Sequence, residues 1–237
     1  MRWFVRRGLR VLMYHKVSRD TADEHTVTPE QLAAQLGWLR AEGFQFVRAA
    51  DLLSGGALPR WPVLVTFDDA YLDTFELARP VLRELGVPAV VFVPTSFIGR
   101  TNVWDGGDRP LMNADQLRAL AADGFELGLH SHAHANYATL TAAQIADDVE
   151  KCFAVFRALA LTPVPALAYP YGKRPARAAR AAMAAALRER GVQAAFRIGN
   201  RINRLPVSEA FEINRLGMRG DESLEAFQRK IYWGRLM

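Results

Sequence analysis

Residues 63–93 read VLVTFDDAYLDTFELARPVLRELGVPAVVFV, and this stretch decides the fold. An apolar run opens it at 63–67, a helical segment follows and stops at Gly86, and a second apolar run closes it at 89–93. Short apolar runs bounded by turn residues are typical of strands, and a glycine just past a helix marks its end. The stretch therefore predicts a strand, a helix and a second strand in succession.

The same alternation continues along the chain in both directions. Three helix starts carry pairs whose side chains and backbone cap each other, namely Thr28 with Gln31, Asn113 with Gln116, and Thr141 with Gln144. Glycines mark predicted helix ends at Gly43, Gly86, Gly124 and Gly191. The remaining strand-like runs lie at 9–14, 44–47, 125–129, 166–169, 194–197 and 213–216.

Alternating strands and helices predict a parallel sheet with right-handed crossovers, either closed as a barrel or open and doubly wound. Seven or eight such units within 237 residues favour the barrel. The open sheet usually has a glycine-rich phosphate loop after its first strand, whereas Tyr14-His15-Lys16-Val17 stands there. Because no segment rich in proline, glycine and serine divides the chain, we expect an α/β fold in which residues 1–237 form one (β/α) barrel domain.

The N-terminus and the apolar runs bear on the compartment. No apolar run approaches the roughly 18 residues that a membrane-spanning helix needs. Arg2, Arg6 and Arg7 resemble the basic flank of an export signal, but the apolar stretch at 9–14 is too short for one and no cleavage site follows. We therefore expect a cytoplasmic protein, with peripheral contact with a membrane left open.

The net charge of +5 is modest, and the arginines are dispersed except around 6–10 and 173–180. No nucleic-acid-binding motif accompanies this charge, so we expect no nucleic-acid partner. An acidic glycan, a phosphate-bearing carrier or an anionic membrane surface would suit the charge equally well. The sequence makes no prediction about the oligomeric state.

Two adjacent carboxylates, Asp68 and Asp69, end the apolar strand at 63–67. Burying two negative charges side by side is costly unless a counter-charge is present. A divalent cation supplies that charge, and it lets one carboxylate coordinate the ion while its neighbour stays free as a base. The alternative is that one of them caps the following helix.

Three histidines cluster in His130-Ser131-His132-Ala133-His134, at the end of another predicted strand. Imidazole nitrogens are good ligands for zinc and related ions. Spacing alone leaves the binding pair open, because all three share a face of an extended strand, whereas one helical turn pairs His130 with His134.

Two further segments follow strand ends. His15 ends the first strand, and Tyr169-Pro170-Tyr171-Gly172 ends the sixth, where a backbone N–H after the proline can face a developing oxyanion. Each segment taken alone is typical of a loop histidine or a turn. In a barrel, however, the carboxyl ends of the strands converge on one face, so the four segments predict one site.

With these residues in view, the chain resembles, along nearly its whole length, the polysaccharide deacetylases, the carbohydrate esterases that share the NodB homology domain. The resemblance implies a NodB-type barrel, with Asp68 as the catalytic base and Asp69 as a metal ligand. It also implies that His130 and His134 are the other two ligands, with His132 outside the set. Residues 168–172 are similar to the family's third motif, which implies that the Tyr171 backbone N–H helps to hold the oxyanion.

The sequence departs from the commoner family pattern in two places. Ala168 and Tyr169 stand where an arginine usually precedes the Pro-Tyr pair, and residues 213–218 lack the usual Leu-x-x-His. Residues 12–15 supply a Leu-x-x-His at the other end of the chain, which is similar to the permuted subgroup that acts on poly-N-acetylglucosamine. The resemblance therefore implies that His15 is the general acid, while the missing arginine leaves open how Asp68 is oriented.

These residues predict a metal-dependent hydrolase that removes the N-acetyl group from a sugar in a polysaccharide, oligosaccharide or glycolipid and releases acetate. Zinc is the expected metal, with cobalt, nickel or manganese as alternatives. Trp104 is the residue we expect to stack on a sugar ring, and Tyr71 and Tyr137 are further aromatic candidates for which core packing is the alternative. Two other functions stay open: a related metal amidase acting on a non-sugar amide, and an inactive barrel that binds glycans.

Overall fold

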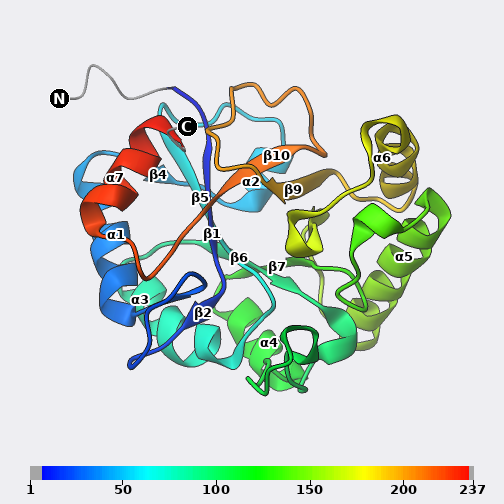
Figure 1. The fold of residues 1–237 in the computed structure, drawn as a ribbon, viewed down its shortest axis with the longest axis horizontal. Coiled ribbons are helices and arrows are strands. Elements are labelled where there is room, and N and C mark those ends of the chain that lie inside the picture. Colours follow the sequence, from blue (N-terminus) through cyan, green and yellow to red (C-terminus); the bar gives the residue numbers. More distant parts are fainter. Residues whose placement is uncertain (1–6, 235–237) are drawn as a thin grey trace.

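The computed structural model of the chain describes residues 7–234 and shows a ring of parallel strands surrounded by helices (Figure 1). The strands of the ring are β1 (Arg10–Tyr14), β5 (Pro62–Phe67), β6 (Ala89–Val93), β7 (Glu126–Leu129), β8 (Ala166–Ala168), β9 (Ala194–Ile198) and β10 (Ile213–Gly217). Within the described residues these seven strands pair in the order β1-β10-β9-β8-β7-β6-β5, and β5 pairs back with β1. The predicted (β/α) barrel is confirmed.

Three short strands lie outside the ring. β4 (Gln45–Phe46) pairs with the start of β5, and it is shorter than the run predicted at 44–47. β2 (Lys16–Val17) and β3 (Thr26–Val27) form a separate parallel pair directly after β1. This pair and the turn between its strands stand beside the carboxyl end of β1.

The helices pack around the outside of the ring. They are α1 (Pro29–Ala41), α2 (Ala49–Leu53), α3 (Arg79–Glu84), α4 (Ala114–Ala122), α5 (Ala142–Ala158), α6 (Arg180–Glu189) and α7 (Leu224–Trp233). The predicted capping pairs at Thr28, Asn113 and Thr141 are present, and each satisfies backbone groups at a helix start. The connection from β9 to β10 contains no helix.

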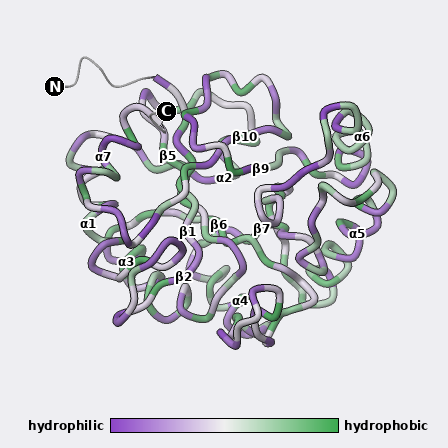
Figure 2. Tube along the Cα trace, viewed as in Figure 1, coloured by the Kyte–Doolittle hydropathy of each residue, from purple (hydrophilic) through white to green (hydrophobic). Residues whose placement is uncertain are grey.

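Side chains along the ring strands point alternately into the ring and out toward the helices, and they form two apolar layers. Val11, Leu64 and Phe196 belong to the layer inside the ring, whereas Leu12 and Val65 belong to the layer under the helices. The tube in Figure 2 changes between hydrophobic and hydrophilic colours along α5, as expected for a helix with one face on the ring. Each fully buried aliphatic or aromatic side chain stabilises this arrangement by about 1.5–3 kcal/mol.

The described helices contain no stretch that is both long and apolar enough to cross a membrane. Arg2 and Arg6, which belong to the basic flank noted in the sequence, lie outside the described residues.

Candidate active site

The carboxyl ends of the ring strands open at one mouth, and the predicted site residues meet there. β5 leads into Asp68 and Asp69, β7 into His130, and β1 into His15. A cavity of about 280 Å³, called the catalytic cavity below, lies between these strand ends. Its lining includes the residues predicted as catalytic residues, metal ligands and sugar-stacking residue, namely His15, Asp68, Asp69, Trp104, His130, His134 and Tyr171, together with Tyr71.

Left-handed backbone conformations concentrate around this cavity. Asp69 has a φ of 70°, His134 of 51° and Tyr171 of 58°, and none of them is a glycine. Such conformations carry a free-energy cost of about 1–3 kcal/mol each, and they persist only where the surrounding structure over-determines them. The sharp turns after β5, β7 and β8 aim these three residues into one cavity.

Asp69 faces two histidines. Its Oδ1 lies 3.3 Å from His130 Nε2 and 3.1 Å from His134 Nε2. His130 Nδ1 donates a hydrogen bond of 2.8 Å to the Ala168 carbonyl, and this fixes the tautomer of a neutral imidazole so that Nε2 keeps a free lone pair. Asp69 Oδ1 is buried and has no hydrogen-bond partner among residues 7–234.

These observations test whether the three residues fit a metal ion. Their ligand atoms all lie within 4.8 Å of one another, and all three residues are buried. Burial alone would raise the pKa of Asp69, but the two imidazoles outweigh this effect and hold its pKa well below its ordinary value. Burial lowers the pKa of His134, which favours the neutral form that binds metals. Two nitrogens and one carboxylate oxygen therefore fit a divalent cation such as zinc.

Asp68 points to the opposite side and meets a guanidinium. Arg215 Nη1 and Nη2 donate hydrogen bonds of 2.5 and 2.7 Å to the two carboxylate oxygens of Asp68, and the Arg215 side chain is 0% exposed. Burial would raise the pKa of Asp68, but the guanidinium outweighs it and the pKa lies below its ordinary value. Arg215 therefore orients Asp68, although no arginine directly precedes Pro170.

The sequence held a signal for Arg215 that the motif analysis missed. Arg215 lies in the middle of β10, between Ile213 and Leu216, both of which are buried. A charged residue within an otherwise apolar strand is costly to bury unless it has a partner of opposite charge. Such a residue is therefore a candidate for pairing with an unpartnered carboxylate.

His15 stands on the same side of the cavity as Asp68. Its Nε2 lies 3.8 Å from Asp68 Oδ2, close enough for charge interaction and too far for a hydrogen bond. Burial lowers the pKa of His15, while the Asp68 and Asp69 charges oppose this effect. The ring of His25, from the turn between β2 and β3, lies 5.4 Å from the His15 ring and was not singled out in the sequence.

Two aromatic side chains contact the His134 imidazole. The Trp104 ring stacks on the His134 ring at 4.2 Å, and the Tyr171 hydroxyl lies 3.1 Å from His134 Nδ1. Trp104 therefore packs against a candidate ligand as well as lining the cavity. The contact of the Tyr171 hydroxyl was not predicted, and the role predicted for its backbone N–H stays a prediction.

The other residues of the histidine segment are structural. His132 lies outside the candidate ligand set, and its Nδ1 contacts Thr95 Oγ1 at 2.9 Å. Asp148 of α5 accepts hydrogen bonds from the Ser131 hydroxyl at 3.0 Å and the Tyr137 hydroxyl at 2.7 Å. Tyr137 is 0% exposed, so core packing, the alternative to sugar stacking, describes it, whereas Tyr71 is 1% exposed and also lines the catalytic cavity.

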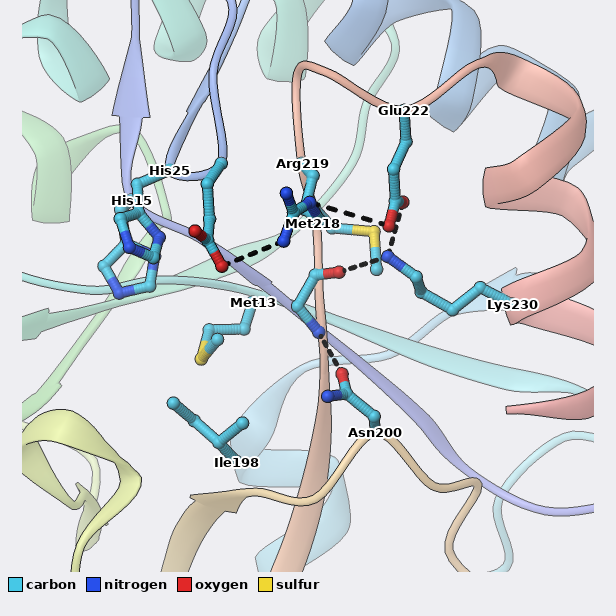
Figure 3. A pocket seen from close by; sticks show the side chains of 11 residues that line it. Met13, His15, His25, Ile198, Asn200, Met218, Arg219, Glu222 and Lys230 are labelled. Atoms are coloured by element: carbon cyan, nitrogen blue, oxygen red, sulfur yellow. Dashed lines mark hydrogen bonds and ion pairs between the residues drawn. The ribbon is translucent and has the colours of Figure 1, made fainter. Parts of the chain in front are cut away.

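A second hollow of about 340 Å³ adjoins the catalytic cavity and shares Met13, His15, His25 and Ile198 with it. Figure 3 shows this side chamber, with Met13, Met218 and Ile198 facing a charged rim. The rim charges pair among themselves: Arg219 contacts Glu24 at 2.8 Å, and Lys230 contacts Glu222 at 2.5 Å. The side chamber therefore combines apolar surface with paired polar groups.

The chain is similar in sequence to proteins of one known family. A family model described as polysaccharide deacetylase matches residues 55–204. The putative polysaccharide deacetylase YxkH of Bacillus subtilis is 27% identical over 169 residues, which are 70% of this chain and 57% of that protein. The poly-β-1,6-N-acetyl-D-glucosamine N-deacetylase of Staphylococcus epidermidis is 29% identical over 116 residues, which are 46% of this chain and 38% of that protein. The matches thus span about half the length of these relatives.

Solved structures agree with the fold. IcaB from Ammonifex degensii is similar with a TM-score of 0.80 and 25% identity, and the match covers 97% of each chain. The Streptococcus pyogenes deacetylase PplD in complex with acetate has the same fold, with a TM-score of 0.77 and 17% identity over 96% of this chain and 99% of that one. Asp68, Asp69 and both candidate histidine ligands lie inside the region matched by the family model. The chain therefore belongs to the polysaccharide deacetylase family.

Proposed function

We propose that this protein is a metal-dependent hydrolase that removes the N-acetyl group from a sugar in a glycan or glycolipid. The observation that carries this proposal is the division of two adjacent carboxylates, in which Asp69 faces His130 and His134 while Asp68 is held by Arg215. One carboxylate is thus free to coordinate an ion and the other to accept a proton. Metal-assisted hydrolysis of an amide uses both functions.

The metal part of the proposal rests on Asp69, His130 and His134, which would hold the ion. When bound, a divalent cation supplies Lewis-acid polarisation of the acetamide carbonyl and lowers the pKa of water in the cavity. Zinc suits this donor set best, with cobalt, nickel and manganese as alternatives. The Tyr171 hydroxyl and the Trp104 ring would keep the His134 imidazole in its binding orientation.

Asp68 is the proposed base. Because Arg215 keeps the pKa of Asp68 low, this carboxylate is ionised at neutral pH and can accept a proton from the attacking water. The bidentate contact with Arg215 also fixes the direction of both carboxylate oxygens. Arg215 is therefore a positioning residue, since its guanidinium acts through Asp68.

His15 is the proposed acid. It lines the catalytic cavity on the side of Asp68, and in its protonated form it can give a proton to the departing amine. The Tyr171 backbone N–H is the proposed donor to the developing oxyanion. The products would be acetate and a free amino sugar.

The choice of a sugar as substrate has two supports. Two relatives are named for deacetylation of a polysaccharide or of poly-β-1,6-N-acetyl-D-glucosamine. The side chamber beside the catalytic cavity joins apolar side chains with polar rim groups, which matches the apolar and hydroxylated faces of a pyranose ring.

The test is acetate release from N-acetylglucosamine oligomers by metal-reconstituted protein, with metal content assayed in parallel. Wild type should release acetate, whereas Asp68→Asn should bind metal and release acetate at least about 10²-fold more slowly. Asp51→Asn removes an exposed carboxylate at the start of α2 and serves as the matched control. Metal binding without acetate release from any sugar would direct the search to non-sugar amides, and a wild type that binds no metal would refute the proposal.

A further inference from the structure

A cluster of arginines lies on the outer face of the ring, away from the catalytic cavity. Arg197 on β9 alternates with Ile198, which lines the catalytic cavity, so the Arg197 side chain lies on the other face of the strand. Arg201 and Arg204 come from the helix-free connection between β9 and β10, the orange loop of Figure 1. These three arginines line a cleft of about 330 Å³, called the arginine cleft below.

Only one glutamate makes ion pairs with this cluster within residues 7–234. Glu212 is bound at 2.5 Å by Arg174, which precedes α6, and it lies 3.8 Å from Arg180 and 3.9 Å from Arg197. Arg174 contacts both carboxylate oxygens of Glu212, one through Nε and the other through Nη2. Glu212 lines the cleft as well, and among the described residues it pairs with Arg197 but not with Arg201 or Arg204.

The arginines that line the cleft have unused donors. The Arg197 Nε is buried and has no hydrogen-bond partner among the described residues. In the same part of the chain, Arg201 and Arg204 form no ion pair or side-chain hydrogen bond. Burial and the neighbouring arginines lower the pKa of Arg197, although the Glu212 carboxylate opposes this effect.

Accumulated positive charge of this kind is unfavourable unless an anion compensates it. Guanidinium groups bind phosphate oxygens through two parallel hydrogen bonds, and such charge-assisted bonds are about twice as strong as neutral ones. Ser208 adds a hydroxyl donor to the lining. Glu209 also lines the cleft, but no ion pair joins it to an arginine within the described residues.

We propose that the arginine cleft, lined by Arg197, Arg201 and Arg204, is a binding site for a phosphoryl group. The site is independent of the deacetylase chemistry, because none of these arginines lines the catalytic cavity. The cleft is linked to the side chamber along the chain, since Asn200 lines the side chamber and the next residue, Arg201, lines the cleft. A phosphoryl group held there would anchor a phosphate-bearing molecule near the side chamber.

The first test is isothermal titration of inorganic pyrophosphate into wild type, Arg201→Gln/Arg204→Gln and a matched control, Arg157→Gln/Arg229→Gln. The control removes two exposed arginines that pair with surface glutamates on α5 and α7. We expect wild type and control to bind equally and the cleft variant to bind at least about 10-fold more weakly. Thermal unfolding of all three proteins checks that the cleft variant is folded, since both replaced side chains are exposed.

The second arm identifies the source of the phosphoryl group. The same proteins are floated with vesicles of phosphatidylcholine alone and of phosphatidylcholine with phosphatidylglycerol. A loss confined to the cleft variant in the phosphatidylglycerol arm supports a lipid headgroup, and a loss confined to the pyrophosphate titration supports a soluble phosphate. If the cleft variant matches the control in both arms, the proposal is overturned, whatever the acetate assay shows.

Discussion

Asp68 and Asp69 are neighbours in the sequence, but their side chains face opposite sides of the catalytic cavity and meet partners of different chemistry. On one side, Asp69 meets His130 and His134, and its Oδ1 is buried without a hydrogen bond among the described residues. On the other side, Asp68 has both oxygens bound by the buried Arg215. Since both carboxylates are buried, their partners are what distinguish the functions we propose for them. Two imidazole nitrogens beside Asp69 suit the proposed metal site, and the guanidinium of Arg215 keeps Asp68, the proposed base, ionised.

The largest effect is expected from Asp69→Ala, which removes the carboxylate from the ligand set. The variant should lose bound metal in elemental analysis and release no measurable acetate, because two histidines alone leave a three-residue zinc site incomplete. Asp51→Ala is the control. A variant that keeps stoichiometric metal would show that Asp69 is not a ligand.

Arg215→Met should reduce kcat by about 10²-fold, in the range typical for a misplaced general base, while metal content stays at the wild-type level. Removing the guanidinium raises the pKa of Asp68, and the reaction needs Asp68 ionised, so the acid limb of the pH–rate profile should move to higher pH. The unfolding free energy should also fall by about 3–5 kcal/mol, because a buried charge loses its partner.

The Arg215→Met/Asp68→Asn double variant separates the two effects. It should regain part of the lost stability and none of the activity, since neither position of the former ion pair then carries an unpaired charge. If Arg215→Met lost stability but kept the wild-type pH profile, the guanidinium would be structural only.

Tyr171→Phe tests the support of the metal side. Losing the hydroxyl that contacts His134 Nδ1 should weaken metal affinity by about 10-fold to 100-fold, measured by competition with a chelating dye. Tyr232→Phe, which removes a hydroxyl bonded to Glu42 on the outer helices, should have no effect on that affinity. Equal metal affinities in the two variants would show that the Tyr171 hydroxyl does not help to hold His134.

Asp73 is a third buried carboxylate, and its negative charge has only a weak partner. Its Oδ1 has no hydrogen-bond partner among residues 7–234, Arg109 lies 3.7 Å from its other oxygen, and burial raises its pKa to about 7. The folded chain therefore binds this proton more tightly than the unfolded chain does. Stability should fall as pH rises from about 4 to about 7, by at most roughly 4 kcal/mol for a shift of this size.

Urea unfolding at pH 4.5 and pH 7.5 measures this effect. Asp73→Asn cannot lose a proton, so its stability should depend less on pH than that of wild type, and acetate release should be unchanged. The same pH dependence in both proteins would mean that Asp73 is not the titrating group.

Local patterns in the sequence were sufficient for the strands, the helix caps and most of the site. The capping pair Thr28 and Gln31 lies within one turn, and its partners can only meet in a helix, so its prediction needed no tertiary information. Asp69 and His130 were found because each lies at the end of a strand, and parallel strands in a barrel end at one mouth. The predicted run at 44–47 gave only two strand residues, because β4 pairs only with the start of β5.

Contacts between side chains of distant segments were not predictable in the same way. Arg215 and Asp68 are 147 positions apart, and their contact depends on β10 and β5 both pairing with β1. The Tyr171 hydroxyl reaches His134 because the backbone at Tyr171 is left-handed, and no residue type at that position signals this turn. Both contacts require the ring to be closed before they can be recognised.

The pairing of β10 with both β1 and β9 has a consequence for synthesis on the ribosome. Asp68, Asp69 and both histidines emerge long before Arg215, so a nascent chain contains the proposed metal ligands while the strand that closes the ring has not yet been made. Asp68, the proposed base, can contact Arg215 only after β10 has been made and has paired with β1. Closure of the ring and the pairing of Asp68 with Arg215 therefore both depend on β10, and a fragment that stops before β10 would lack both.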